Sequence, residues 1–157
     1  MTPLQALPPC DWPALLSLIR RAFAGMEGRI DPRSSMHALT PEMIAEQATT
    51  AEIRVIGSPA VACLFLTPKP GSLYLHKLAV DPAHQGQGHA RSLIASATTR
   101  ARALGLPALT LSTRVELVEN HSVFRALGFL ETARSAHPGF DPPTTIHFTL
   151  PLTGDLP

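Results

Sequence analysis

Apolar residues recur at helical spacing in two long segments of the chain. In 12–23 they fall every three or four positions, after Asp11, a residue type that caps the starts of helices. A second stripe begins after Gly88 and ends before Gly105, and glycine commonly terminates a helix. The members of this stripe are Leu93, Ile94, Ala97, Ala101 and Leu104. We expect both stripes to face a hydrophobic core.

Shorter patterns predict the remaining helices and strands. Two short helices are expected, over 41–48 after a Thr-Pro-Glu start and over 120–127 before a closing glycine. Runs rich in apolar and β-branched residues, bounded by glycine and proline, predict six strands. These runs are 51–57, 60–67, 72–80, 108–113, 129–135 and 144–150.

The order of these elements indicates an α+β fold with a mixed, twisted sheet. Two helices precede three strands that short turns join into an antiparallel meander. The strand–helix–strand unit over 73–113 then implies one parallel pair of strands. Neither a repeat nor a low-complexity linker interrupts the 157 residues, so we expect a single domain spanning 1–157.

Composition and charge narrow the functional classes. Hydrophobic residues make up 45% of the chain and charged residues 16%, which is typical of a globular protein. A net charge of +1 gives no support to nucleic acid or a membrane surface as the partner. No apolar run approaches the ~18 residues that a membrane span needs, and a signal-peptide pattern is missing at the start. We therefore expect a soluble cytoplasmic protein.

The cysteines and histidines do not form a metal-binding pattern. Cys10 and Cys63 lie far apart in the sequence, and two separate thiols are favoured over a disulfide. His84 and His89 are five residues apart and lack a third ligand nearby, so we expect no metal.

The strongest chemical signal lies between Gln85 and Arg91. Gly86 and Gly88 stand where a strand gives way to a helix, although glycine weakens helices. The first turn of a helix leaves N–H groups free and carries the positive end of the helix dipole, so it binds phosphate well. The dinucleotide pattern GxGxxG fails at Arg91, and no P-loop pattern is present. On spacing alone, phosphate binding and close packing of the glycines are equal alternatives.

The wider pattern resembles the GNAT N-acyltransferase superfamily. Residues 80–90 read V-x-P-x-x-Q-x-x-G-x-A, and Gln85, Gly88 and Ala90 fill that family's acyl-CoA signature, Q/R-x-x-G-x-G/A. Downstream, 119–129 looks like the family's asparagine-bearing helix that ends in a Gly-Phe pair. The resemblance covers roughly 50–135, and it implies a mostly antiparallel sheet flanked by helices on both faces.

The resemblance also implies acetyl-CoA as the acyl-donor co-substrate. The diphosphate of coenzyme A would lie on backbone groups of the glycine turn, and the pantetheine arm would run along the preceding strand. The residues implied are Leu78, Ala79, Val80, Gln85, Gly86, Gln87, Gly88, His89, Ala90 and Arg91, with Asn120 and Phe124 from the second helix.

The implied chemistry is direct attack of a primary amine on the thioester in a ternary complex. A main-chain N–H near Leu78 would stabilise the oxyanion that develops. His76 and Glu116 are the candidate general bases: His76 is two residues from Leu78 on the same expected strand face, and Glu116 lies near an expected splay of the strands. The family often has a tyrosine that protonates the thiolate where this chain has Phe124, so water or another residue does this, or catalysis is weak.

The sequence leaves the acceptor open between a small-molecule and a peptide amine, and the chain between a monomer and a homodimer. Loop residues that are candidates for selecting the acceptor are Arg29, Asp31, Ser35, Arg114 and His137. His121 is a further candidate beside Asn120. The alternative function is an acyl-CoA sensor or an interaction domain of the same fold, without turnover.

Overall fold

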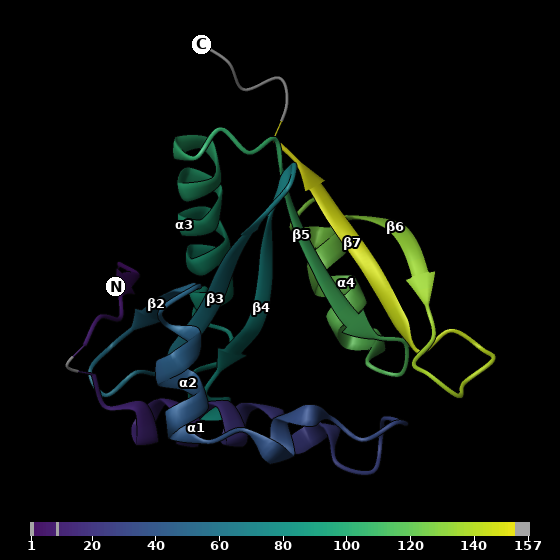
Figure 1. The fold of residues 1–157 in the computed structure, drawn as a ribbon, viewed down its shortest axis with the longest axis horizontal. Helices are drawn as coiled ribbons and strands as arrows, with labels where there is room; N and C mark the ends of the chain where they lie inside the picture. Colours follow the sequence, from purple (N-terminus) through teal and green to yellow (C-terminus); the bar gives the residue numbers. More distant parts are fainter. Residues whose placement is uncertain (1, 9, 153–157) are drawn as a thin grey trace.

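The computed structural model describes residues 2–8 and 10–152, where seven strands form one sheet and four α-helices pack on it (Figure 1). The helices are α1 (Trp12–Phe23), α2 (Pro41–Gln47), α3 (His89–Ala103) and α4 (Val118–Ala126). The strands are β1 (Leu4–Gln5), β2 (Glu52–Ile56), β3 (Ala62–Lys69), β4 (Ser72–Val80), β5 (Ala108–Arg114), β6 (Leu130–Ser135) and β7 (Thr145–Pro151). The α+β class and all ten elements predicted from the sequence are confirmed.

The strands follow the order β1-β2-β3-β4-β5-β7-β6 across the sheet. Every neighbouring pair is antiparallel except β4 and β5, which α3 connects as the sequence predicted. β1 was not predicted. It is two residues long and exposed, so no alternation of apolar and polar residues reveals it, and it pairs through Leu4 opposite Val55.

Helices cover both faces of the sheet, and each face has its own hydrophobic cluster. On one face, Leu93 of α3 and Phe124 of α4 belong to a buried cluster with Leu64 of β3. On the other, Ile19 of α1 packs in a cluster with Phe65 of β3. Leu64 and Phe65 join different clusters because successive side chains of a strand point to opposite faces. The predicted helical stripes thus face two core layers.

Capping groups set where the helices begin. The side chains of Asp11 and Thr40 each accept a hydrogen bond from the backbone N–H three residues further on, at 3.0 and 3.1 Å. α4 begins at Val118, two residues earlier than expected, and no side chain caps it. Asn120 therefore lies within the first turn of α4, and not at its start.

The end of α3 corrects one member of its predicted stripe. Leu93, Ile94, Ala97 and Ala101 are buried, but Leu104 is 39% exposed. The helix stops at Ala103, and Gly105 follows with a φ of 71°. Leu104 is wrong as a core residue, because it caps the end of α3 next to the left-handed Gly105 and its side chain stays partly in solvent.

β4 and β5 stay together for only three residue pairs. Their pairing covers Leu73 with Leu109, Tyr74 with Thr110 and Leu75 with Leu111. Beyond Leu75 the two strands diverge into a V, and the chain from α1 onward lies across the open end (Figure 1). The second half of β4 therefore has no strand on its β5 side within the described residues.

A bulge in β4 accompanies this divergence. The pairing with β3 shifts by one residue between His76 and Ala79, so Lys77 and Leu78 together face a single β3 residue. Lys77 has a φ of 52°, and among the described residues it is the one non-glycine with a positive φ. Backbone strain of this kind persists where the surrounding structure enforces it.

The bulge contradicts the expectation that His76 and Leu78 share a face of the strand. Leu78 packs on the cluster that contains Leu75. The ring of His76 instead lies 5.5 Å from the ring of Phe65, which belongs to the opposite cluster. One extra residue reverses every side chain that follows it, because the side-chain period of a strand is two.

Both cysteines in the structure are free thiols, Cys10 half-buried and Cys63 buried, which confirms separate thiols over a disulfide. Within 2–8 and 10–152, none of the helices combines the length and the apolar character that crossing a membrane demands.

We predict that Leu93→Ala and Leu104→Ala differ sharply in their effect on stability. Leu93 is fully buried, so its truncation leaves a cavity and lowers the free energy of unfolding by about 2–5 kcal/mol. Leu104→Ala removes the same atoms from an exposed position and costs less than about 1 kcal/mol. Urea denaturation measures both variants, and equal losses would contradict the described end of α3.

Candidate functional site

Two adjoining cavities lie where β4 and β5 diverge. The larger has a volume of about 680 Å³ and extends to the glycine turn, and the smaller has about 380 Å³ and lies between the strands. Six residues line both: Phe23, Met26, Leu78, Leu117, Asn120 and Phe124. The shared lining shows that the two cavities meet beside the β4 bulge.

The glycine turn presents main-chain N–H groups to the larger cavity. Gly86 and Gly88 have φ values of 78° and 82°, a left-handed conformation that other residues adopt with strain. A Cβ atom built on either glycine would meet nothing within 4 Å, so the turn is open to a ligand. Ser92 is the first α3 residue whose N–H bonds back, to Gly88 O at 3.0 Å. The N–H groups of 89–91 therefore have no partner within the helix.

A glutamine side chain holds the turn in shape. The Oε1 of Gln87 accepts hydrogen bonds from His84 Nδ1 at 3.3 Å and from His89 Nε2 at 3.1 Å. Gln85, which fills the family signature, lines the larger cavity but makes no side-chain hydrogen bond with the described residues. The sequence did offer a signal for the role of Gln87, because His84 stands three residues before Gln87 and His89 two residues after it.

The structure brings most of the predicted cofactor-binding residues together. Eleven of the twelve line the larger cavity: Leu78, Ala79, Val80, Gln85, Gly86, Gly88, His89, Ala90, Arg91, Asn120 and Phe124. Gln87 is the exception, because its side chain is occupied by the two histidines. Arg91 is exposed and has no ion-pair partner in the described part of the chain.

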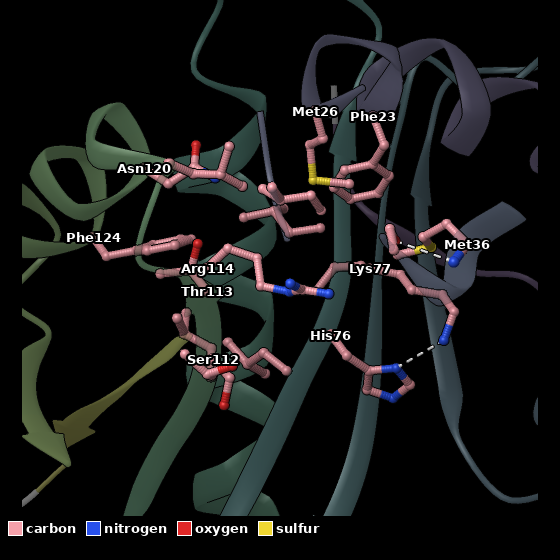
Figure 2. Close-up of a pocket in the computed structure, with 18 of the residues that line it drawn as sticks. Phe23, Met26, Met36, His76, Lys77, Ser112, Thr113, Arg114, Asn120 and Phe124 are labelled. Carbon is pink, nitrogen blue, oxygen red and sulfur yellow. Dashed lines mark hydrogen bonds between the residues drawn. The ribbon is translucent and has the colours of Figure 1, made fainter. Parts of the chain in front are cut away.

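The smaller cavity combines an apolar base with polar walls (Figure 2). His76 and Lys77 come from β4, and Arg114 comes from the facing strand β5. Met26 and Met36, from the chain segment after α1, also line this cavity. The loop that holds the acceptor candidates Arg29, Asp31 and Ser35 thus contributes to this cavity through Met26.

His76 is neutral at physiological pH. Burial lowers its pKa to about 4, and the positive charges of Lys77 and Lys69 act in the same direction. Its Nε2 lies 2.9 Å from Thr67 Oγ1, and its Nδ1 lies 3.3 Å from Lys77 Nζ. Because the ammonium donates, Nδ1 accepts and Nε2–H donates to Thr67.

Lys77 lies in the bulge of β4, and Cys63 of β3 lies beside it. Burial lowers the pKa of the Lys77 ammonium, while nearby Cys63 raises it by a smaller amount. Burial also raises the pKa of Cys63 to about 12, and its Sγ donates to Lys77 O at 3.5 Å. Cys63 is therefore an inert thiol, and Lys77 is a cation partly removed from water.

Glu116 lines neither cavity. Its Oε2 accepts a hydrogen bond from the backbone N–H of Asp31 at 3.2 Å, and its Oε1 is buried with no hydrogen-bond partner among the described residues. The carboxylate therefore faces the loop that covers the cavities, and the structure does not bring it together with His76 and Leu78.

Of the loop residues that are candidates for selecting the acceptor, some line a cavity and others do not. Arg29 lines the larger cavity and pairs with Glu119 at 2.8 Å, and Arg114 lines the smaller one. Asp31, Ser35 and His137 line neither cavity.

His121 is buried, and its Nε2 donates to Arg114 O at 2.9 Å, so it holds the end of β5. Within the described residues, no group of three or more His, Cys, Asp or Glu side chains is placed to hold a metal ion.

Lys77 and Phe23 are cavity residues that sequence reasoning missed. Lys77 reaches the cavity because of the bulge, which no residue pattern predicts, and Phe23 does so because α1 crosses the open end of the V.

Phe124, by contrast, lies where the pattern placed it. It is 9% exposed, packs on Phe129 and Phe148 with ring centroids 6.0 Å apart, and lines both cavities.

Comparison with known proteins agrees with this geometry. The ribosomal-protein-S18-alanine N-acetyltransferase of Escherichia coli superposes with a TM-score of 0.70 at 20% identity, covering 96% of this chain and 94% of that one. An Elizabethkingia anophelis GNAT family acetyltransferase with acetyl-CoA bound gives 0.68 at 17% identity, covering 96% and 97%. A Bacillus subtilis acetyltransferase in complex with CoA gives 0.65 at 16%, covering 96% and 98%. No curated protein sequence matches the chain.

These structural likenesses show the fold, and the sequence itself shows the family. The model of the acetyltransferase (GNAT) family matches residues 13–129, which is more than half of the 157 residues. The chain therefore belongs to the GNAT acetyltransferase family, whose members transfer acyl groups.

Proposed function

We propose that this protein is an N-acetyltransferase that moves the acetyl group of acetyl-CoA to a primary amine. The observation that carries the proposal is the meeting of two cavities at Leu78 and Phe124, one reaching the glycine turn and the other open to an acceptor. The acceptor is a small-molecule or peptide amine. The E. coli neighbour, an alanine N-acetyltransferase of ribosomal protein S18, makes an amine acceptor chemically plausible for this fold.

The residues around the larger cavity fit coenzyme A. The free N–H groups of 89–91 and the positive end of the α3 dipole suit the diphosphate, and the open glycines admit it. The edge of β4 after Leu75 lacks a strand partner in the described part, so its main chain can bond the amides of the pantetheine arm. Leu78, Ala79 and Val80 supply this edge, and Asn120 and Phe124 close it from α4.

The reaction then needs only positioning and charge stabilisation. The amine nitrogen bonds to the carbonyl carbon of the thioester, the carbon–sulfur bond breaks, and its electron pair leaves on the thiolate of coenzyme A. The proton that the amine loses passes to a base or to water, and the thiolate takes up a proton. A main-chain N–H at Leu78 stabilises the negative charge that develops on the carbonyl oxygen.

Among the predicted bases, His76 fits the proposal better than Glu116. His76 lines the acceptor-side cavity and is unprotonated at neutral pH, whereas Glu116 supports the covering loop. A pKa of about 4 makes His76 a weak base, since general bases work best with a pKa near the operating pH. Its basic nitrogen, Nδ1, already accepts from Lys77, so we assign His76 only a modest share in removing the amine proton, which requires that contact to open.

A second candidate function is an acyl-CoA sensor or interaction domain without turnover. Phe124 favours it, because a phenyl ring cannot protonate a departing thiolate. A thiol-release assay over a panel of amines separates the two functions. Acetyl-CoA binding with no amine-dependent release of thiol would select the sensor, and absence of coenzyme A affinity in calorimetry would select an interaction domain.

We predict that Gly88→Glu weakens acetyl-CoA binding about tenfold or more. The new carboxylate repels the diphosphate at the start of α3, and a side chain at φ 82° strains the turn. Isothermal titration calorimetry gives the dissociation constant. Gly71→Glu is the control, because Gly71 has a φ of 77° and equally open surroundings but lies outside both cavities. An equal loss in both variants would mean that backbone strain alone acts.

We predict that Phe124→Tyr keeps or raises kcat, by up to about tenfold. The hydroxyl would stand where the two cavities meet and provide a proton donor for the thiolate. The measurement is thiol release at saturating acetyl-CoA, with circular dichroism to verify folding. A large fall in kcat with an intact fold would show that the site requires an apolar ring.

We predict that His76→Gln reduces the loss of stability at acid pH. The folded chain holds His76 at a pKa of about 4, below the 6.5 of an ordinary histidine. Between these values the unfolded chain binds the proton and the folded chain does not, so stability present above pH 6.5 is lost as pH falls. The difference corresponds to about 3 kcal/mol.

Urea denaturation between pH 7 and pH 4 measures this effect on the free energy of unfolding. The variant should lose about 3 kcal/mol less than the wild type over that range. His37→Gln serves as the control, because His37 is partly exposed and pairs with Glu27 at 2.8 Å. An unchanged pH dependence in His76→Gln would contradict the burial of a neutral imidazole.

A further inference from the structure

The smaller cavity carries positive charge that no carboxylate in its lining balances. Among the described residues, the lining has two cationic side chains, Lys77 and Arg114, and no aspartate or glutamate. They come from the two diverging strands, β4 and β5 (Figure 2). Ser34, Tyr74 and Ser112 add hydroxyl groups to the lining. The cavity, at about 380 Å³, is in the size range of small-molecule sites.

The guanidinium of Arg114 lies in the lining of this cavity. It is the last residue of β5, and its guanidinium extends toward β4 in Figure 2. Nη1 donates to Pro32 O at 2.7 Å, which fixes the side chain, but a neutral carbonyl does not cancel the charge. Arg114 forms no ion pair with any described residue. Its remaining N–H groups form a planar fork that matches a carboxylate.

Lys77 adds a second uncompensated cation. The bulge places its Nζ 3.3 Å from His76 Nδ1 and 5.1 Å from the ring centroid of Phe65. Both neighbours are uncharged, and no carboxylate lies within ion-pair distance of Nζ in the part of the chain that the structure describes. A partly buried ammonium without a counter-ion is unfavourable, and its lowered pKa reflects this desolvation.

Other arginines of the chain are treated differently. Arg21 pairs with Asp81 at 3.0 Å, and Arg54 pairs with Glu52 at 2.7 Å. The Arg21 side chain is about half exposed, but that of Arg54 is only 13% exposed, so the fold supplies a carboxylate to a cation that it largely removes from water. Lys77 and Arg114 receive no such carboxylate, and both line the same cavity.

We propose that the acceptor is a small primary amine that also carries a carboxylate, which Arg114 binds while Lys77 adds to the positive field around it. This inference rests on the proposed acetyl transfer and narrows its acceptor. The carboxylate would supply the missing counter-ion, and the amine would then lie toward Leu78, where the cavities meet. A positive surrounding also lowers the pKa of a bound ammonium, which favours the neutral amine that attacks.

The first test compares matched acceptors in the thiol-release assay with saturating acetyl-CoA. Amino acids of increasing chain length are each compared with the amide of the same amino acid, which lacks only the negative charge. Rates are expressed per neutral amine, because the amide changes the pKa of the amine. For at least one amino acid, we expect kcat/KM to be about ten times that of its amide or more. The difference should come from a lower KM for the acid. Equal values for every pair would overturn the proposal and leave acetyl transfer standing.

Variants then identify the side chains responsible. Arg114→Gln should raise KM for the acid alone. The ratio of kcat/KM for the acid to kcat/KM for its amide should then fall close to one. Lys77→Met, which keeps a long side chain in the bulge, should lower the ratio by a smaller factor. Arg125→Gln is the control, because Arg125 is exposed on α4 and lines neither cavity. A ratio that survives in both cavity variants would overturn the assignment.

A binding experiment tests the anion site without turnover. The melting temperature is measured with increasing glutarate and, separately, with its uncharged diamide, after addition of coenzyme A to occupy the glycine turn. We expect glutarate but not the diamide to stabilise the wild type and Arg125→Gln, and to have no effect on folded Arg114→Gln.

Stabilisation by glutarate with no thiol release from any amine would refute the proposed acetyl transfer but retain the anion site. No response to glutarate, or the same response in Arg114→Gln, would overturn the anion site.

Discussion

A strand that loses its neighbour halfway along leaves backbone N–H and C=O groups that need new partners. β4 is such a strand, because its pairing with β5 stops at Leu75 while the strand continues to Val80. The bulge at Lys77 turns the unpaired half away from β5, and both cavities lie along the gap. This one incomplete pairing opens the space that the glycine turn, the cationic side chains and α1 then border.

The elements of the fold were predictable because each has a local cause. Asp11 and Thr40 cap their helices, and the buried stripe of α3 and the alternation in β5 show which faces meet the core. What escaped prediction depends on tertiary structure. β1 exists only because β2 offers it an edge, and the bulge that separates His76 from Leu78 arises from register with β3.

In the candidate site, too, the parts with a local cause were predictable and the parts that depend on tertiary structure were not. The glycine turn was predictable, since left-handed residues before a helix require glycine and the surrounding pattern resembles a known family. The acceptor side was not, because it draws Phe23, Lys77 and Arg114 from segments far apart in sequence. Glu116 shows the limit most clearly. Its position in the chain is near the splay, but its carboxylate faces the covering loop.

That loop is fastened at three neighbouring points to the chain between β5 and α4. Arg29 pairs with Glu119, the N–H of Asp31 donates to Glu116, and the carbonyl of Pro32 accepts from Arg114. Residues of this loop line both cavities, so one segment of chain borders the two spaces. If the proposed acetyl transfer holds, an amino-acid change in this loop alters access to both ligands at once, so the choice of acceptor evolves together with the affinity for the donor.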